Sequence, residues 1–399
     1  MAKNKDQKQK ASVCLVMIVK NESEVIKRCI DSVKNHISYW VICDTGSTDG
    51  TQKIIKTTME EYGIPGELHE HEWVDYGTNR TRSLELSKDK GDYRLIIDAD
   101  DFLNVWDEEN LFVNLTEDSY KIRLKLGEIS YFRTQIVKSN QDWKYVGVLH
   151  EFLEGPLGVE LTEGYIEEAE MIAAVSGDTR DIKGNSKYYN DALIFEKELV
   201  GKPDLDSGLK TRYQFYLAQS YRDAGMYERS IENYQKRVDL GGWPEEVYIS
   251  LYMIAKMKIA LGKSEDDVIN SYLKAWEYRP VRLEAAYNLI RFLVDKKRYF
   301  LAFTIAGTCM RMKACDDILF VESEIWKWKM ADEFSVLAYY TGNINEAYIA
   351  ANSILKSEDF QMIPESERER ITKNFETFEK VYNDQKEKKK AREAESVES

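Results

Sequence analysis

The sequence predicts an α/β domain followed by an all-α domain, on three observations. Up to about residue 175, apolar β-branched runs alternate with amphipathic helical segments, which is typical of a mostly parallel sheet with helices on both faces. Beyond about residue 180, helical periodicity takes over and β-branched runs become rare. Aromatic and small residues recur there at similar spacings, which indicates an internal repeat.

The elements of the first half follow from these patterns in order. Residues 12–19 predict a buried strand, and residues 39–43 predict a second strand followed by a helix from about 51 to 62. Further along, residues 67–72 predict a strand, 78–88 a helix and 93–97 a fourth strand. From 119 to 148 the pattern is strand-like without helices, which predicts an antiparallel extension at one edge of the sheet.

The second half predicts stacked helical hairpins. Ser230 and Ala302 occupy similar places in two copies of the repeat, and the 72 positions between them leave room for two helix pairs of about 34 residues. Small residues of this kind allow helices to cross closely. We therefore expect disorder in residues 1–10, the α/β domain in 11–180, the repeat domain in 181–380 and a charged tail in 381–399.

Composition narrows the class of protein. The chain has 399 residues, 43% of them hydrophobic, which is too high a share for a disordered protein, and it contains no apolar stretch of about 20 residues. The lack of such a stretch predicts no membrane insertion. Five cysteines without a CxxC pair indicate reduced thiols and a cytoplasmic protein. The net charge is −14, of which −11 lies in residues 1–180. This charge disfavours a protein built mainly to bind nucleic acid, and an acidic site that handled phosphates would need a cation.

Three polar segments follow predicted strands of the sheet: Val19–Glu22, Cys43–Thr51 and Leu95–Asp101. In an open parallel sheet, ligands bind at the carboxyl ends of the strands. Each segment alone is also compatible with an ordinary turn or an acidic helix start. Together, in this order, they predict a ligand site.

The residue types in these segments point to a metal-dependent nucleotide site. Asp98 and Asp100 offer the hard oxygen ligands that suit Mg²⁺ or Mn²⁺, which can bridge the diphosphate of a nucleotide. Asp44 can accept hydrogen bonds from a base or a ribose, and Gly46 allows a close approach of the backbone. The chain contains no GxGxxG and no GxxxxGK[ST] motif, which disfavours dinucleotide and P-loop sites.

Residues 12–175 resemble a family 2 glycosyltransferase with the GT-A fold. The resemblance lies in the motifs IVKNE, DTGSTDGT, GTNRT and DADD, which begin at residues 18, 44, 77 and 98. The helical half, with FYLAQSY and GGWPEEVY, resembles the tetratricopeptide (TPR) family in a degenerate form. The resemblance implies a nucleotide-sugar-binding domain fused to TPR-like helices.

The resemblance also implies roles for individual residues. Asp100 would bind the metal with His150 as a further ligand, and Glu151 or Asp101 would be the general base. The residues that would bind the nucleotide-sugar are Asn21, Glu22, Asp44, Gly46, Ser47, Arg80, Asp98 and Ala99. Arg133 and Trp143 are candidates for the sugar or acceptor pocket, with ordinary packing as the alternative.

The expected function is a metal-dependent inverting glycosyltransferase that uses Mn²⁺ or Mg²⁺ and a nucleotide-diphosphate sugar, with a UDP-sugar favoured. Acceptors compatible with the sequence are a protein or peptide side chain, a glycan, and a modified nucleic-acid base. The helical half would help to bind the acceptor or form a homo-oligomer. The alternative is a non-catalytic helical-repeat scaffold with a degenerate transferase domain, and the presence of Asp44, Asp98 and Asp100 argues against it.

Overall fold

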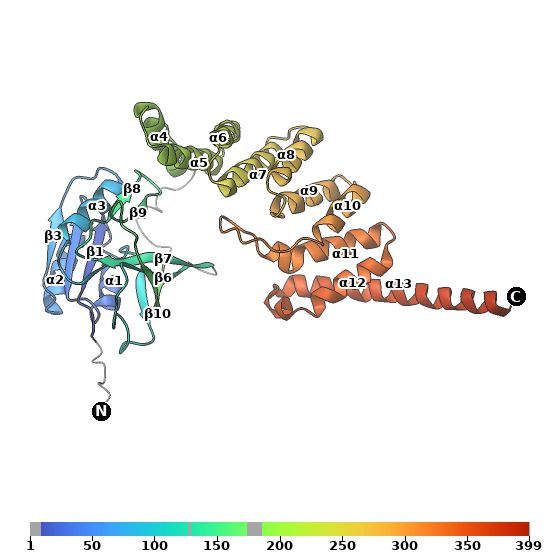
Figure 1. The fold of residues 1–399 in the computed structure, drawn as a ribbon, viewed down its shortest axis with the longest axis horizontal. Coiled ribbons are helices and arrows are strands. Elements are labelled where there is room, and N and C mark those ends of the chain that lie inside the picture. The colour runs from blue at the N-terminus through green and yellow to red at the C-terminus, as the bar shows by residue number, and fades with distance from the viewer. Residues whose placement is uncertain (1–8, 127–128, 174–185, 399) are drawn as a thin grey trace, which may run out of the picture. The chain divides into compact units, whose positions relative to one another are not determined.

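The computed structural model describes residues 9–126, 129–173 and 186–398 (Figure 1). The described chain divides into two compact units, Met1–Ile194 and Phe195–Ser399. Most of the expected disordered segment, and the expected domain boundary at residue 180, lie outside the described residues. Within them, no helix combines the length and the apolar composition needed to cross a bilayer.

The first unit contains an eight-stranded sheet in the order β3-β2-β1-β4-β7-β6-β10-β5. Its strands are β1 (Val13–Val19), β2 (Tyr39–Asp44), β3 (Gly66–Glu70), β4 (Tyr93–Ile96), β5 (Phe102–Val105), β6 (Ser119–Leu126), β7 (Ile129–Lys138) and β10 (Glu163–Ile172). The pairs among β1, β2, β3 and β4 are parallel, whereas β7 pairs antiparallel with both β4 and β6. The predicted parallel sheet with an antiparallel extension is confirmed.

Helices and a small hairpin cover the two faces of this sheet. They are α1 (Ile26–Val33), α2 (Thr51–Glu61), α3 (Tyr76–Leu86), β8 (Lys144–Val146) and β9 (Phe152–Glu154). One core cluster joins the sheet to α1 and α2, and a second joins it to α3 and the hairpin. Helix α3 begins two residues before the predicted start because Asp75 caps it, accepting a hydrogen bond from the backbone N–H of Thr78 at 2.7 Å.

The second unit is all-helical, as predicted. Its helices are α5 (Ser207–Asp223), α6 (Tyr227–Leu240), α7 (Pro244–Ala260), α8 (Glu265–Tyr278), α9 (Glu284–Asp295), α10 (Tyr299–Cys309), α11 (Met330–Tyr340), α12 (Ile344–Leu355) and α13 (Glu365–Glu398). Helix α4 (Ser186–Gly201) crosses the division between the units, a π-helical turn (Ile325–Lys329) leads into α11, and a short 3₁₀ helix (Glu358–Met362) precedes α13.

Small residues lie where these helices cross. Ser230, Ala302 and Ala347 are fully buried, and each lies near the start of the second helix of a hairpin. This confirms the predicted repeat, because only small side chains let helix backbones approach so closely. The expected charged tail, residues 381–399, continues α13 as helix through Glu398.

Candidate nucleotide-sugar site

The loops after β1 and β2 are joined at the carboxyl edge of the sheet. The backbone N–H of Asn21 donates to Ser47 Oγ at 2.8 Å, and Asn21 Oδ1 accepts from the N–H of Thr48 at 2.9 Å. The N–H of Glu22 donates to Thr51 Oγ1 at 2.8 Å. Asn21 has a φ of 55°, a left-handed conformation that Asn tolerates better than most residues. Both predicted segments therefore form one structure.

Asp44 is held at the base of this structure. Its Oδ1 accepts from the N–H groups of Gly46 and Ser47, both at 2.9 Å, and from Gln52 Nε2 at 3.1 Å. Its Oδ2 is buried, and no donor in the described part of the chain reaches it. Gly46, with a φ of +102°, faces open space, since a Cβ there would meet nothing within 4 Å. A ligand N–H would satisfy the remaining oxygen, whose burial without a donor is unfavourable.

Arg80 on α3 connects two of the predicted carboxylates. Its Nη2 lies 2.6 Å from Asp98 Oδ1, and its Nε lies 2.8 Å from Glu151 Oε1. The guanidinium carbon lies 5.5 Å from the ring centroid of Tyr145, within range of a cation–π contact. Only 11% of the Arg80 side chain is exposed. The two carboxylates therefore share one largely buried counter-charge.

Asp98, two residues after the end of β4, also faces Arg133 of β7, with Oδ2 3.7 Å from Nη2. Burial raises the pKa of Asp98, but the charges of Arg80 and Arg133 outweigh burial, and the pKa lies below its usual value. The neighbouring Ala99 is buried, so its small side chain fits beneath the turn.

A close approach of backbones brings Glu151 to Arg80. A Cβ on Gly77, in the first turn of α3, would lie 2.1 Å from the carbonyl oxygen of Gly147, so only glycine fits there. The N–H of Tyr76 donates to the carbonyl oxygen of Val148 at 3.3 Å. The segment then turns at His150, which has a φ of 52°. Helix α3 and the loop that carries His150 and Glu151 are thus docked together.

These groups surround a cavity of about 560 Å³. Its lining includes five of the predicted site residues: Arg80, Asp98, Arg133, His150 and Glu151. It also includes eight residues that were not predicted for the site: Tyr76, Thr134, Tyr145, Leu149, Phe152, Leu153, Lys187 and Asp191. Tyr145 lies in the same segment as the predicted His150 and Glu151, and its position two residues after Trp143 is the one signal that could have identified it.

Nine predicted site residues do not line this cavity: Asn21, Glu22, Asp44, Gly46, Ser47, Ala99, Asp100, Asp101 and Trp143. Trp143 is only 7% exposed and belongs to the core cluster beneath α3 and the hairpin, so its role is packing. Asp101 is 5% exposed and lies near the Cys29 thiol of α1, whose pKa is raised first by burial and then by the Asp101 charge. The sequence could not distinguish these buried positions from cavity positions, because both occur in the same polar segments.

The described residues contain no group of three His, Cys, Asp or Glu side chains placed to hold a metal ion. Asp98 pairs with Arg80 and Arg133, and the residue predicted to bind the ion is Asp100. Mg²⁺ is usually held by one or two protein carboxylates together with substrate phosphates. Asp100 beside a bound diphosphate would meet that requirement.

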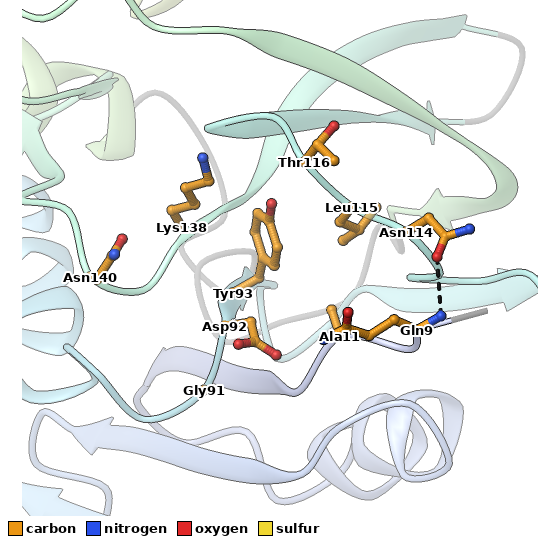
Figure 2. Close-up of a pocket in the computed structure, with 10 residues that line it drawn as sticks. All are labelled: Gln9, Ala11, Gly91, Asp92, Tyr93, Asn114, Leu115, Thr116, Lys138 and Asn140. Carbon is orange, nitrogen blue, oxygen red and sulfur yellow. Dashed lines mark hydrogen bonds between the residues drawn. The ribbon is translucent and has the colours of Figure 1, made fainter. Parts of the chain in front are cut away.

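A second cavity of about 560 Å³ opens at the opposite end of the parallel strands (Figure 2). Its charged groups already have partners, since Asp92 accepts two hydrogen bonds from Ser12 and Lys138 lies 2.9 Å from Asp118. Asn114 accepts from the N–H of Gln9 at 3.0 Å. Asp92 and Lys138 therefore hold neighbouring segments together at this end of the sheet.

Comparison with known proteins finds a family match over part of the chain. Residues 14–119 match the family model described as glycosyl transferase family 2. The chain is 28% identical over 154 residues to a TPR repeat-containing protein of Synechococcus elongatus, covering 37% of this chain and 36% of that protein. It is 34% identical over 94 residues to the prophage-derived glycosyltransferase SunS of Bacillus subtilis, covering 24% and 20%. The chain thus spans little more than a third of the first relative and a fifth of the second.

The solved structures found by comparison have low similarity scores. S. aureus TarS 1–349 has a TM-score of 0.35 at 14% identity, covering 67% of this chain and 92% of that one. The mannosyltransferase PcManGT of Pyrobaculum calidifontis, in complex with GDP-Man and Mn²⁺, has 0.34 at 13%, covering 68% and 85%. Kinesin light chain TPR-like repeats of Podospora anserina have 0.34 at 15%, covering 47% and 93%.

Proposed function

We propose that this protein is a metal-dependent inverting glycosyltransferase that uses a UDP-sugar. The match of residues 14–119 to glycosyl transferase family 2 supports this proposal. The observation that carries the proposal is the gathering of Arg80, Asp98, His150 and Glu151 around one cavity at the carboxyl edge of the sheet. This edge is where α/β sheets bind ligands.

Asp44 supports a uridine nucleotide. Its Oδ1 is saturated by three donors, so one oxygen, Oδ2, is left to read the base. One acceptor suits the single N3–H of uracil. Guanine offers adjacent N1–H and N2–H₂ donors that favour a two-oxygen contact, and cytosine presents an acceptor at N3.

Asp100, with His150 as a further ligand, would hold the divalent ion, Mn²⁺ or Mg²⁺. The bound ion would supply charge stabilisation for the departing nucleoside diphosphate. Arg80 and Arg133 add positive charge on the same side of the cavity, and each contacts Asp98. Their guanidinium groups suit the planar recognition of phosphate oxygens.

Glu151 is the candidate general base, in preference to the buried Asp101. Its carboxylate lines the cavity and is oriented by Arg80 at 2.8 Å. In an inverting transfer, an acceptor hydroxyl or thiol bonds to the anomeric carbon while the bond from that carbon to the diphosphate oxygen breaks. Glu151 takes the acceptor's proton, and the bonding electrons leave with the diphosphate.

Three further points stay predictions. They are the identity of the acceptor, the formation of a homo-oligomer through the helical half, and a cytoplasmic location. A protein or peptide side chain, a glycan and a modified nucleic-acid base are the acceptor classes that the sequence supports.

The test is donor hydrolysis and calorimetric binding across UDP-, GDP-, CMP- and dTDP-sugars with Mn²⁺ or Mg²⁺. We expect binding and slow metal-dependent release from UDP-sugars, and loss of release in Asp100→Ala. The matched control is Asp142→Ala, which removes a carboxylate that is 80% exposed. If no nucleotide binds with either metal, the transferase proposal is wrong and the scaffold alternative takes its place.

A further inference from the structure

One face of the sheet carries an exposed aromatic pair. Phe132 of β7 and Tyr165 of β10 meet at nearly right angles with ring centroids 5.0 Å apart. Their exposed fractions are 42% and 53%, although the adjacent Ile166 points to the other face and is buried in the core. Large apolar groups that remain in water forgo the stabilisation of burial, so an exposed cluster of this kind indicates a binding surface.

Two cations flank the pair on the same face. Lys121 Nζ lies 5.9 Å from the Tyr165 ring centroid, and the Arg123 guanidinium carbon lies 5.3 Å from that of Phe132. The strand register agrees, since Lys121 lies opposite Tyr165 and Arg123 lies opposite Phe132. Directly opposed residues share one face of a sheet.

Thr134 connects this surface to the candidate active site. Thr134 lines the cavity, and its Oγ1 lies 3.3 Å from Glu163 Oε2. Glu163 pairs with Lys121 at 2.6 Å. We call the group of Lys121, Arg123, Phe132, Glu163 and Tyr165 the acceptor platform; it begins at the cavity wall and extends over β6, β7 and β10.

We propose that the acceptor platform binds a neutral oligosaccharide, one of whose hydroxyls reaches the cavity as the acceptor. The inference rests on the proposed transferase function and selects the glycan among its acceptor classes. A sugar ring has a face of C–H groups and a rim of hydroxyls. The aromatic rings offer apolar contact to the C–H face, and Lys121, Glu163 and Thr134 offer donors and acceptors to the rim.

Charge and strand pairing disfavour the other acceptor classes. The net charge of −11 in residues 1–180 would repel a polyanion such as nucleic acid. An extended peptide commonly binds by pairing with a free strand edge. Here β6, which carries Lys121 and Arg123 at the centre of the platform, is paired with β7 on one side and with β10 on the other, so it offers no edge.

The test is binding of chitohexaose, cellohexaose and maltohexaose to the full chain by calorimetry, with oligothymidylate and a Ser/Gly peptide as comparison probes. We expect at least one hexasaccharide to bind, and the double variant Phe132→Ala/Tyr165→Ala to weaken it at least tenfold. UDP affinity should stay within twofold. Tyr131→Ala is the matched control, because Tyr131 is 47% exposed on the same strand but opposes the buried Leu124 on the other face.

Three results would overturn the acceptor platform: no hexasaccharide binding at millimolar concentration, a double variant that binds as tightly as the wild type, or preferential binding of oligothymidylate or the peptide. Failure of the transferase proposal would look different, since UDP would then bind with neither metal. Glycan binding is measured without any donor, so the two failures are separate.

Discussion

Replacing Arg80 with alanine should destabilise the first unit and remove the ion pairs that join Asp98 and Glu151 to one arginine. The change removes a side chain that is 11% exposed and leaves Asp98 and Glu151, 28% and 14% exposed, without their shared counter-charge. Breaking a buried ion pair costs about 3–5 kcal/mol, and an exposed one about 0–1 kcal/mol. Because Asp98 is partly exposed, we expect a loss of about 2–3 kcal/mol. For a unit of this size, the loss corresponds to a drop in Tm of about 4–12 °C.

Calorimetric unfolding of Arg80→Ala, Glu151→Ala and the double variant measures this directly. If the Arg80–Glu151 contact stabilises the fold, the two single variants together should lose more unfolding free energy than the double variant does. We expect the difference to be about 1 kcal/mol or more. Lys88→Ala is the control, because its pair with Asp142 is 40% and 80% exposed and should be worth less than about 1 kcal/mol. Strictly additive effects, or a loss in Arg80→Ala no larger than in Lys88→Ala, would refute the reasoning.

Three further changes test other parts of the site and the sheet. Gly77→Ala should cost about 1–3 kcal/mol of unfolding free energy and reduce donor turnover, since its Cβ would lie 2.1 Å from the Gly147 carbonyl oxygen. Gly201→Ala, which meets nothing within 4 Å, is the control, and equal stability of the two variants would contradict this reading. Asp44→Asn should place a donor where Oδ2 lies, weakening UDP binding about tenfold or more while CDP binding holds or improves. Calorimetry with both nucleotides checks this, and a parallel loss for UDP and CDP would exclude base reading by Asp44. Hydrogen bonds from Lys90, Tyr39 and His69 lower the pKa of Glu67 from 4.5 to about 2. Its stabilisation is therefore complete above pH 4.5 and is lost as the pH falls toward 2, so Glu67→Gln should lose less stability than the wild type over that range in urea denaturation. Identical acid profiles would count against the Glu67 hydrogen bonds as a source of stability.

The sequence by itself determined which loops meet at the site. The segments after β1, β2 and β4 each end a parallel strand, and the carboxyl ends of such strands share one edge of the sheet. Asp44, Asp98 and Asp100 could therefore be placed at one edge of the sheet from strand periodicity alone. The repeat was determined in the same way, because the spacing of small residues such as Ser230 and Ala302 reflects helix crossings along the chain.

Only the tertiary structure decided which side chains contact one another within that edge. Arg80 and Glu151 are far apart in the chain, and they meet because the close approach of Gly77 to Gly147 docks α3 against the loop at His150. The same docking places Tyr145 in the cavity, while Trp143, two residues earlier, packs in the core. Periodicity along one segment reports the face on which a residue lies. Which element covers that face depends on the packing of segments distant in sequence, and that packing separates the site residues from the core.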